Sequence, residues 1–311
     1  MTNDASYILT VDTGGSKSKL ALFNSDGACV ADGRCEGMGY VGEKKGGFPF
    51  LKAVLKKLLN DIPPSSVKTV VINLGGTNTE QLTAEFQSLF PLATIKAYRD
   101  SSGGIMSAFC KAEAVNAILM AGTGTIALAI GENGSVITDG WGPGVGDLGS
   151  GYWIGLEAIV RSLKMLEERG ELSPLCKRIT GLDKPFSAFN DTTEQMMIRD
   201  EVRKGFMPIE RARVAALTKV AAECARSGDR MAAEIFDEAG VHLASCVARG
   251  LVAVGLSEAE ILVSGGLINS FDLWECSFKK TLCSFGNKFR YRIGEADMTR
   301  GAAFFALNML K

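Results

Sequence analysis

The chain repeats one pattern of strands and turns, and this internal repeat limits the folds open to it. The first copy reads as a strand (Tyr7–Asp12), a glycine turn, a strand (Lys19–Asn24), an Asp-Gly turn and a third strand. The second copy has strands at Ala117–Ala121 and Ile126–Ile130, then an Asn-Gly turn and a third strand. Asp-Gly and Asn-Gly are strong hairpin signals, because type I′ turns need positive φ angles. Both copies therefore predict the same antiparallel three-stranded unit.

The similarity between the copies continues downstream. Val70–Gly76 (VVINLGG) and Ile261–Gly266 (ILVSGG) both read as apolar strands that end in two glycines. Each is followed by a helical pattern and a short strand, Thr94–Asp100 or Phe289–Asp297, and then by a further helix. Three antiparallel strands followed by helix, strand, helix, strand and helix, twice over, predict two α/β domains that face each other.

The second copy also contains a long Ala-rich insertion, in which apolar residues recur at helical spacing. The helical stretches are Trp153–Leu166, Glu210–Arg226 and Arg230–Val254. We expect a first domain over residues 1–112 and a second over 113–311. The final helix, 299–311, could cross back onto the first domain.

Composition argues against several kinds of partner. The formal net charge is -1, which gives no electrostatic case for binding nucleic acid or a membrane surface. The uncharged stretch 114–131 is interrupted by polar residues and glycines, so it reads as two buried strands and not as a membrane span. No signal segment precedes the first strand, and the eight cysteines form no CxxC motif. We therefore expect a cytoplasmic protein with reduced thiols.

Both glycine turns have the composition of a phosphate site, because backbone N–H groups in a tight turn can converge on an anion. The turns are Thr13-Gly14-Gly15-Ser16 in the first copy and Gly122-Thr123-Gly124-Thr125 in the second. Lys17 or Lys19 could add a positive charge beside the first turn. Two such turns could hold the β- and γ-phosphates of one nucleotide.

Asp12 precedes the first turn, where the second copy has Ala121. A carboxylate beside a triphosphate needs a cation, so Asp12 is predicted to bind Mg²⁺, directly or through water. The alternative is that Asp12 caps the turn.

Other residues suit a nucleotide base and a small polar molecule near the phosphate turns. Gly265 and Gly266 would let an adenine ring pack against the backbone. The glycine-rich loop 142–155 would supply flexible backbone beside Trp141 and Asp147, which could bind the apolar face and the hydroxyls of a sugar. Alternatively, Trp141 is a core aromatic residue and Asp147 a structural cap.

Asp100 ends a predicted strand, where it could accept the proton of an attacking hydroxyl. It could instead cap the following helix. Its counterpart in the repeat, Asp297, is predicted to be only such a cap.

Six motifs resemble the N-acetylglucosamine kinase-like branch of the BadF/BadG/BcrA/BcrD ATPase family, within the sugar kinase, Hsp70 and actin superfamily. They are VDTGGSKSK, AYRDSSGGIMSA, ILMAGTGTIA, DGWGPGVGDLGSGYWIG, ILVSGGLIN and ADMTRGAAFFAL, and they span nearly the whole chain. The resemblance implies duplicated actin-like (ribonuclease H-like) ATPase domains with a helical insertion in the second. It also implies an ATP-dependent kinase that phosphorylates a small sugar, N-acetylglucosamine or a related amino sugar.

The same resemblance assigns roles to single residues. Asp12–Lys17 and Gly122–Thr125 become the two phosphate motifs, Gly265 and Gly266 part of the adenosine motif, and Asp100 the catalytic aspartate. Gly76, Thr77, Trp141, Gly142 and Asp147 become the sugar side. The implied cofactors are ATP and Mg²⁺. The chain departs from the family pattern at Arg99, Leu148, Gly39-Tyr40 and Gly75, mostly on the acceptor side, so the nucleotide is better defined than the sugar.

Two other functions remain open from the sequence. One is an ATPase that activates a 2-hydroxyacyl-CoA dehydratase, but such activators carry a cysteine just before the second phosphate turn, where this chain has Met120-Ala121. The other is a nucleotide sensor or scaffold without a sugar substrate, which would have no need of Asp12 or Asp100. A small-molecule sugar is the expected partner, and a homodimer remains open.

Overall fold

The computed structural model describes residues 6–13, 17–37, 48–74, 79–99, 103–168, 170–189, 191–286 and 288–309. The chain forms two compact units. Unit 1 consists of Met1–Ala114 and Asp297–Lys311, and unit 2 of Val115–Ala296. Within the described ranges, no helix is both long and apolar enough to cross a membrane.

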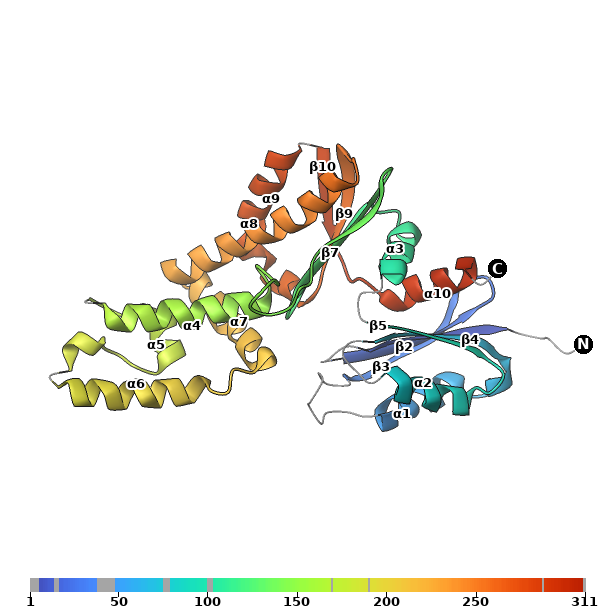
Figure 1. Ribbon diagram of the computed structural model, residues 1–311, viewed down its shortest axis with the longest axis horizontal. Coiled ribbons are helices and arrows are strands. Elements are labelled where there is room, and N and C mark those ends of the chain that lie inside the picture. Colours follow the sequence, from blue (N-terminus) through green and yellow to red (C-terminus); the bar gives the residue numbers. More distant parts are fainter. Residues whose placement is uncertain are drawn as a thin grey trace, which may run out of the picture. The chain divides into compact units, whose positions relative to one another are not determined.

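Unit 1 is a five-stranded mixed sheet with helices on both faces (Figure 1). Its elements are β1 (Tyr7–Thr13), β2 (Lys17–Asn24), β3 (Cys29–Glu36), α1 (Phe48–Leu59), β4 (Val67–Leu74), α2 (Thr79–Leu89), β5 (Thr94–Arg99), α3 (Gly103–Ala112) and α10 (Met298–Met309). The strand order is β3-β2-β1-β4-β5, with antiparallel pairs among β1, β2 and β3 and parallel pairs among β1, β4 and β5. Alternate apolar residues of β1, Leu9 and Val11, share a buried core with Leu51 of α1 and Phe86 of α2.

Unit 2 repeats this topology. Its strands are β6 (Ala117–Ala121), β7 (Thr125–Gly131), β8 (Gly134–Asp139), β9 (Glu258–Ser264) and β10 (Lys288–Ile293), in the order β10-β9-β6-β7-β8. The antiparallel pairs β6–β7 and β7–β8 and the parallel pairs β6–β9 and β9–β10 match those of unit 1. The predicted α/β duplication is therefore confirmed.

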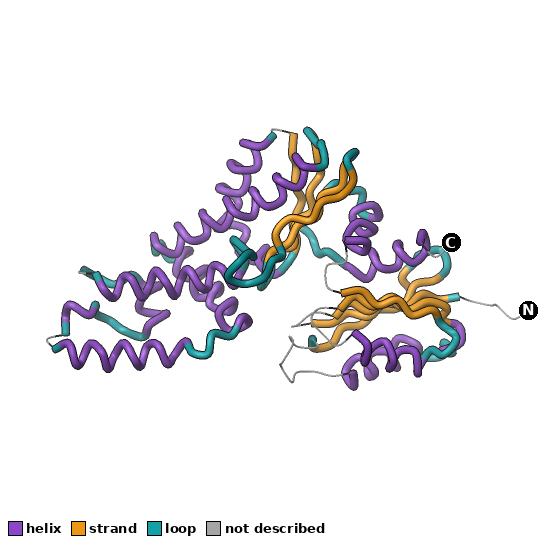
Figure 2. Tube along the Cα trace, in the orientation of Figure 1, coloured by secondary structure: helices purple, strands orange, loops and turns teal. Residues whose placement is uncertain are grey.

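The helical insertion of unit 2 lies in the sequence between β8 and β9. Figure 2 shows its helices in purple beside the strands of unit 2. The insertion contains α4 (Gly151–Glu167), α5 (Pro174–Thr180), α6 (Thr192–Phe206), α7 (Arg211–Arg226) and α8 (Arg230–Ala253), and α9 (Phe271–Phe285) follows β9. The α8 helix packs on β6, β7 and β8 as well as on α9. Its buried face is a continuous run of small and apolar residues, which agrees with the predicted helical spacing.

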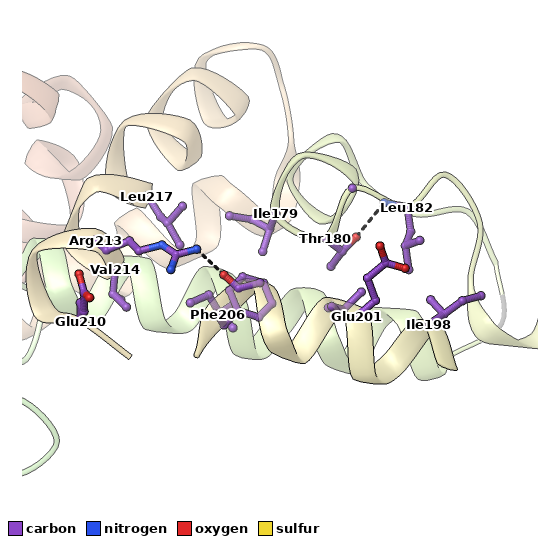
Figure 3. A pocket seen from close by; sticks show the side chains of 14 residues that line it. Ile179, Thr180, Leu182, Ile198, Glu201, Phe206, Glu210, Arg213, Val214 and Leu217 are labelled. Carbon is purple, nitrogen blue, oxygen red and sulfur yellow. Dashed lines mark hydrogen bonds between the residues drawn. The ribbon is translucent and has the colours of Figure 1, made fainter. Parts of the chain in front are cut away.

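A mainly apolar cavity of about 500 Å³ lies between helices of the insertion (Figure 3). Ile159 of α4, Ile179 of α5, Phe206 of α6 and Leu217 of α7 contribute to its lining. Arg213 of α7 reaches across and donates a hydrogen bond to the carbonyl oxygen of Gly205. The first turns of α7 therefore form part of the cavity wall.

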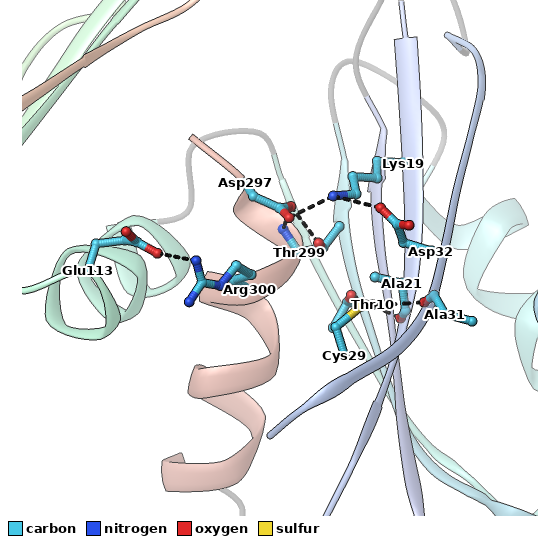
Figure 4. Close-up of polar contacts among 10 residues, drawn as sticks. All are labelled: Thr10, Lys19, Ala21, Cys29, Ala31, Asp32, Glu113, Asp297, Thr299 and Arg300. Atoms are coloured by element: carbon cyan, nitrogen blue, oxygen red, sulfur yellow. Dashed lines mark hydrogen bonds and ion pairs between the residues drawn. The ribbon is translucent and has the colours of Figure 1, made fainter. Parts of the chain in front are cut away.

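The last helix, α10, packs against α3 and β1 within unit 1. Asp297 accepts a hydrogen bond from the Thr299 N–H at its start, as a helix cap does. The other Asp297 oxygen lies 2.7 Å from Lys19 Nζ, and Lys19 also lies 3.1 Å from Asp32 Oδ2 (Figure 4). Lys19 therefore connects β2, β3 and the start of α10.

Burial by itself would raise the pKa of Asp297, but Lys19 and Thr299 hold it below its ordinary value of 3.8. A lowered carboxyl pKa contributes stability above 3.8, and this stability is lost as the pH falls through the folded-state pKa. We expect Lys19→Met to lower the free energy of unfolding by about 1 kcal/mol near neutral pH. The difference from wild type should shrink on acidification.

Urea unfolding followed by circular dichroism, at neutral and acidic pH, measures this effect. Lys52→Met, a change at an exposed lysine of α1, is the matched control and should show little difference at either pH. A Lys19→Met effect that stays constant through the titration range of Asp297 would contradict the prediction.

Candidate active site

The turn between β6 and β7 offers hydrogen-bond donors that the protein itself leaves unused. Its Gly122 N–H donates to the Gly124 carbonyl oxygen at 2.9 Å. Within the described part of the chain, the N–H groups of Thr123 and Gly124 have no acceptor. The hydroxyl of Thr125 is buried and also lacks a partner there. Buried polar groups are usually satisfied, so the Thr125 hydroxyl fits a ligand that the protein alone does not supply. The N–H groups of the half-buried Thr123 and Gly124 are donors that an anion could use beside it.

The first turn of α4 holds this glycine turn in place. The Gly151 N–H donates to the Gly122 carbonyl oxygen at 2.8 Å, and the Tyr152 N–H donates to that of Thr123 at 3.1 Å. The first N–H groups of a helix have no partner inside the helix, so they are free to bind the turn. Ser150 caps the helix by accepting from the Trp153 N–H.

Asp147 is buried and contacts the turn. Its Oδ1 accepts the Thr125 N–H at 3.1 Å, and its Oδ2 lies 2.7 Å from Arg211 Nη2. Burial raises the pKa of the Asp147 carboxyl, while the Thr125 N–H and the Arg211 guanidinium act in the opposite direction. Both carboxylate oxygens thus already accept a hydrogen bond within unit 2. A contact between Asp147 and a sugar stays a prediction.

Trp141 is 79% exposed, so the alternative of a core aromatic residue does not hold. It is followed by Gly142, whose φ of 94° is readily adopted only by glycine. The Gly142 carbonyl oxygen accepts from the Gly146 N–H at 2.9 Å, which closes the loop on itself. An exposed indole on a short loop can stack on the apolar face of a sugar, and this role stays a prediction.

Gly265 and Gly266 lie where β9 meets β6. Gly265 has a φ of 106°, and an added Cβ would lie 2.2 Å from the Ala121 carbonyl oxygen. A Cβ added to Gly266 would meet nothing within 4 Å, and the Gly266 backbone nitrogen lies 3.9 Å from the Cβ position of Gly122. The predicted adenosine motif and the second glycine turn are therefore neighbours within unit 2.

In unit 1, Asp12 lies opposite Asn73 of β4 and Lys19 of β2. Its Oδ1 accepts from Asn73 Nδ2 at 2.8 Å, and the Oδ1 of Asn73 is buried without a partner among the described residues. Lys17 begins β2 and is exposed, whereas Lys19 is occupied by its two aspartates. A contact between Lys17 and a phosphate stays a prediction.

Several predicted site residues lie outside the described residues. They are Gly14, Gly15, Ser16, Gly76, Thr77 and Asp100. Their roles stay predictions.

Two residues with a place in the site were missed by the sequence reasoning. Asn73 could have been noticed, because it is a polar residue in the apolar strand VVINL. Arg211 gave no signal, because it lies 64 positions from Asp147 and only the fold brings the two together.

The model of the BadF/BadG/BcrA/BcrD ATPase family matches residues 9–303. An N-acetylmuramic acid/N-acetylglucosamine kinase of Clostridium acetobutylicum is 30% identical over 168 residues, which are 53% of this chain and 52% of that protein. The chain thus matches about half the length of that relative. An N-acetyl-D-glucosamine kinase of Dictyostelium discoideum is 24% identical over 97% of this chain and 98% of its own length.

Solved structures confirm the predicted actin-like fold. A candidate N-acetylglucosamine kinase of Chromobacterium violaceum superposes with a TM-score of 0.69, at 21% identity, over 97% of this chain and 99% of that one. A ROK hexokinase of Thermus thermophilus superposes with a TM-score of 0.54, at 14% identity, over 98% and 100%. At such identities the similarity concerns the fold.

Proposed function

Because the chain belongs to the BadF/BadG/BcrA/BcrD ATPase family, we propose that it transfers the γ-phosphoryl group of ATP to a hydroxyl of a small sugar, with N-acetylglucosamine or a related amino sugar as acceptor. Both curated relatives that match are kinases of such sugars. The observation that carries the proposal is the turn Gly122–Thr125. Its two N–H groups without acceptors and its buried hydroxyl are the donors that a nucleotide phosphate requires.

Asp12 and Asn73 fit a magnesium site of the kind found in kinases. No group of three or more His, Cys, Asp or Glu side chains that could hold a metal occurs among the described residues. Mg²⁺ commonly uses one or two carboxylates together with phosphate oxygens and water, so a single aspartate suffices. When bound, the ion would neutralise charge on the phosphates. Asn73 holds the Asp12 carboxylate in place for it.

On the acceptor side, we assign Asp100 as the base that takes the proton of the attacking hydroxyl. The exposed Trp141, with the half-buried Gly142 beside it, provides a surface for the sugar ring, and Gly76 and Thr77 complete this side. Phosphoryl transfer needs positioning and charge neutralisation more than covalent chemistry, and these residue types provide both.

A coupled ADP-release assay tests the proposal against glucosamine, N-acetylglucosamine, N-acetylmuramic acid, N-acetylmannosamine and glucose. We expect at least one amino sugar to raise ADP release by about a hundredfold or more over the rate without acceptor, because only a correctly placed hydroxyl makes transfer efficient. ATP hydrolysis that no sugar stimulates would overturn the sugar kinase assignment and favour an activator or nucleotide sensor.

A further inference from the structure

Arg211, the first residue of α7, packs directly against the glycine turn of unit 2. A Cβ added to Gly124 would lie 2.3 Å from Arg211 Nη2 and 2.9 Å from Asp147 Oδ2. The guanidinium and the carboxylate thus lie side by side next to Gly124. Glycine at position 124 is what allows this close approach.

Arg211 and Asp147 form an ion pair that compensates the negative charge beside the turn. Asp147 is buried, and a carboxylate in such a place is costly unless an opposite charge compensates it. Arg211 supplies that charge at 2.7 Å, and Asp147 in turn accepts the Thr125 N–H. Without Arg211, an uncompensated carboxylate would lie next to the N–H groups of Thr123 and Gly124 and would repel an anion bound there.

We propose that Arg211 is a positioning residue for the nucleotide phosphates, which acts by neutralising Asp147 and fixing its hydrogen bond to the turn. The proposal rests on the proposed function, because it takes the turn to be a phosphate site. It also gives the helical insertion an indirect part in nucleotide binding, since Arg211 of α7 pairs with Asp147, which holds the turn.

The test is the affinity for ADP, measured by isothermal titration calorimetry without any sugar. We expect Arg211→Met to weaken ADP binding about tenfold or more, because it leaves a buried charge unpaired. Adding Asp147→Asn to that variant should recover much of the loss, because the second change removes the repelling charge and keeps an acceptor for the Thr125 N–H. A residue that only stabilised the fold would not show this recovery.

Two further variants complete the set. Arg213→Met removes an arginine two positions further along α7 that bonds to Gly205, and it should leave ADP affinity within about twofold. Arg211→Lys keeps the positive charge and should lose less affinity than Arg211→Met, which gives a second reading if the methionine variant folds poorly.

The outcomes separate the inference from the proposed function. Unchanged ADP affinity in Arg211→Met, or a double variant weaker than Arg211→Met alone, would overturn the role of Arg211. Weakened ADP binding with the expected recovery would support that role even if no sugar were phosphorylated. A wild-type chain that binds no nucleotide would overturn both.

Discussion

Asp100→Asn should lower the turnover number with the best acceptor by about a thousandfold, while the affinity for ADP stays within about twofold of wild type. A carboxylate can accept the proton of the attacking hydroxyl, whereas a carboxamide of the same size cannot. Because the change preserves shape, the nucleotide should still bind. Steady-state kinetics together with calorimetry of ADP binding measure the two quantities separately.

The internal repeat provides the matched control for this experiment. Asp297 occupies the corresponding place in the second copy, where it caps α10 and pairs with Lys19. Asp297→Asn should therefore lower the stability of unit 1 and leave turnover within a few-fold. Near-normal turnover in Asp100→Asn would remove Asp100 from the mechanism. Equal losses in both variants would point to folding and away from proton transfer.

The fold could be predicted from the sequence because its signals are local and occur twice. Asp26-Gly27 and Asn133-Gly134 turn the chain between β2 and β3 and between β7 and β8, as predicted. Gly27 and Gly134 have positive φ but Asp26 and Asn133 do not, so the predicted type I′ geometry was wrong while the hairpins themselves form. Once one copy was read, the second could be aligned to it. The same succession of strands and helices was then expected in both.

The local sequence did not predict the end of a strand where pairing with the neighbouring strand decides it. The stretch Phe289–Asp297 was predicted to be one strand, but β10 ends at Ile293. There the Gly294 N–H donates to the Val263 carbonyl oxygen and the Ala296 N–H to the Ser264 hydroxyl, while Asp297 caps α10. A strand-like composition cannot reveal that the neighbouring strand has ended.

The glycines of the loop 142–155 show a similar limit. The number of glycines predicts a flexible backbone for a sugar site. In the structure, however, several of these glycines allow close packing against neighbouring backbone. A Cβ on Gly151 would lie 3.1 Å from the Gly122 carbonyl oxygen, one on Gly149 2.7 Å from that of Ala239, and one on Gly155 2.0 Å from that of Val214. The sequence shows that a glycine is present. Only the fold shows whether that glycine provides backbone flexibility or allows close packing.

Gly265→Ala should lower the free energy of unfolding of unit 2 by about 2 to 6 kcal/mol, the sum of backbone strain and overpacking. Gly265 has a φ of 106°, which an alanine adopts only with strain, and the new methyl group would lie 2.2 Å from the Ala121 carbonyl oxygen. The backbone at the end of β6 must then move. For a unit of this size, the midpoint of thermal unfolding should fall by about 10 °C.

Gly266→Ala is the matched control for stability, because nothing lies within 4 Å of the added methyl group. It should change the unfolding free energy by less than about 0.5 kcal/mol. The two variants also separate an effect on packing from an effect on binding. Ala121 precedes the glycine turn, and the methyl group of Gly265→Ala would displace Ala121. Gly265→Ala should therefore also weaken ADP binding, because the turn moves with Ala121. Gly266→Ala can affect binding only through the methyl group itself. Equal thermal midpoints for the two variants would show that β6 and β9 do not approach as closely at Gly265 as its geometry requires.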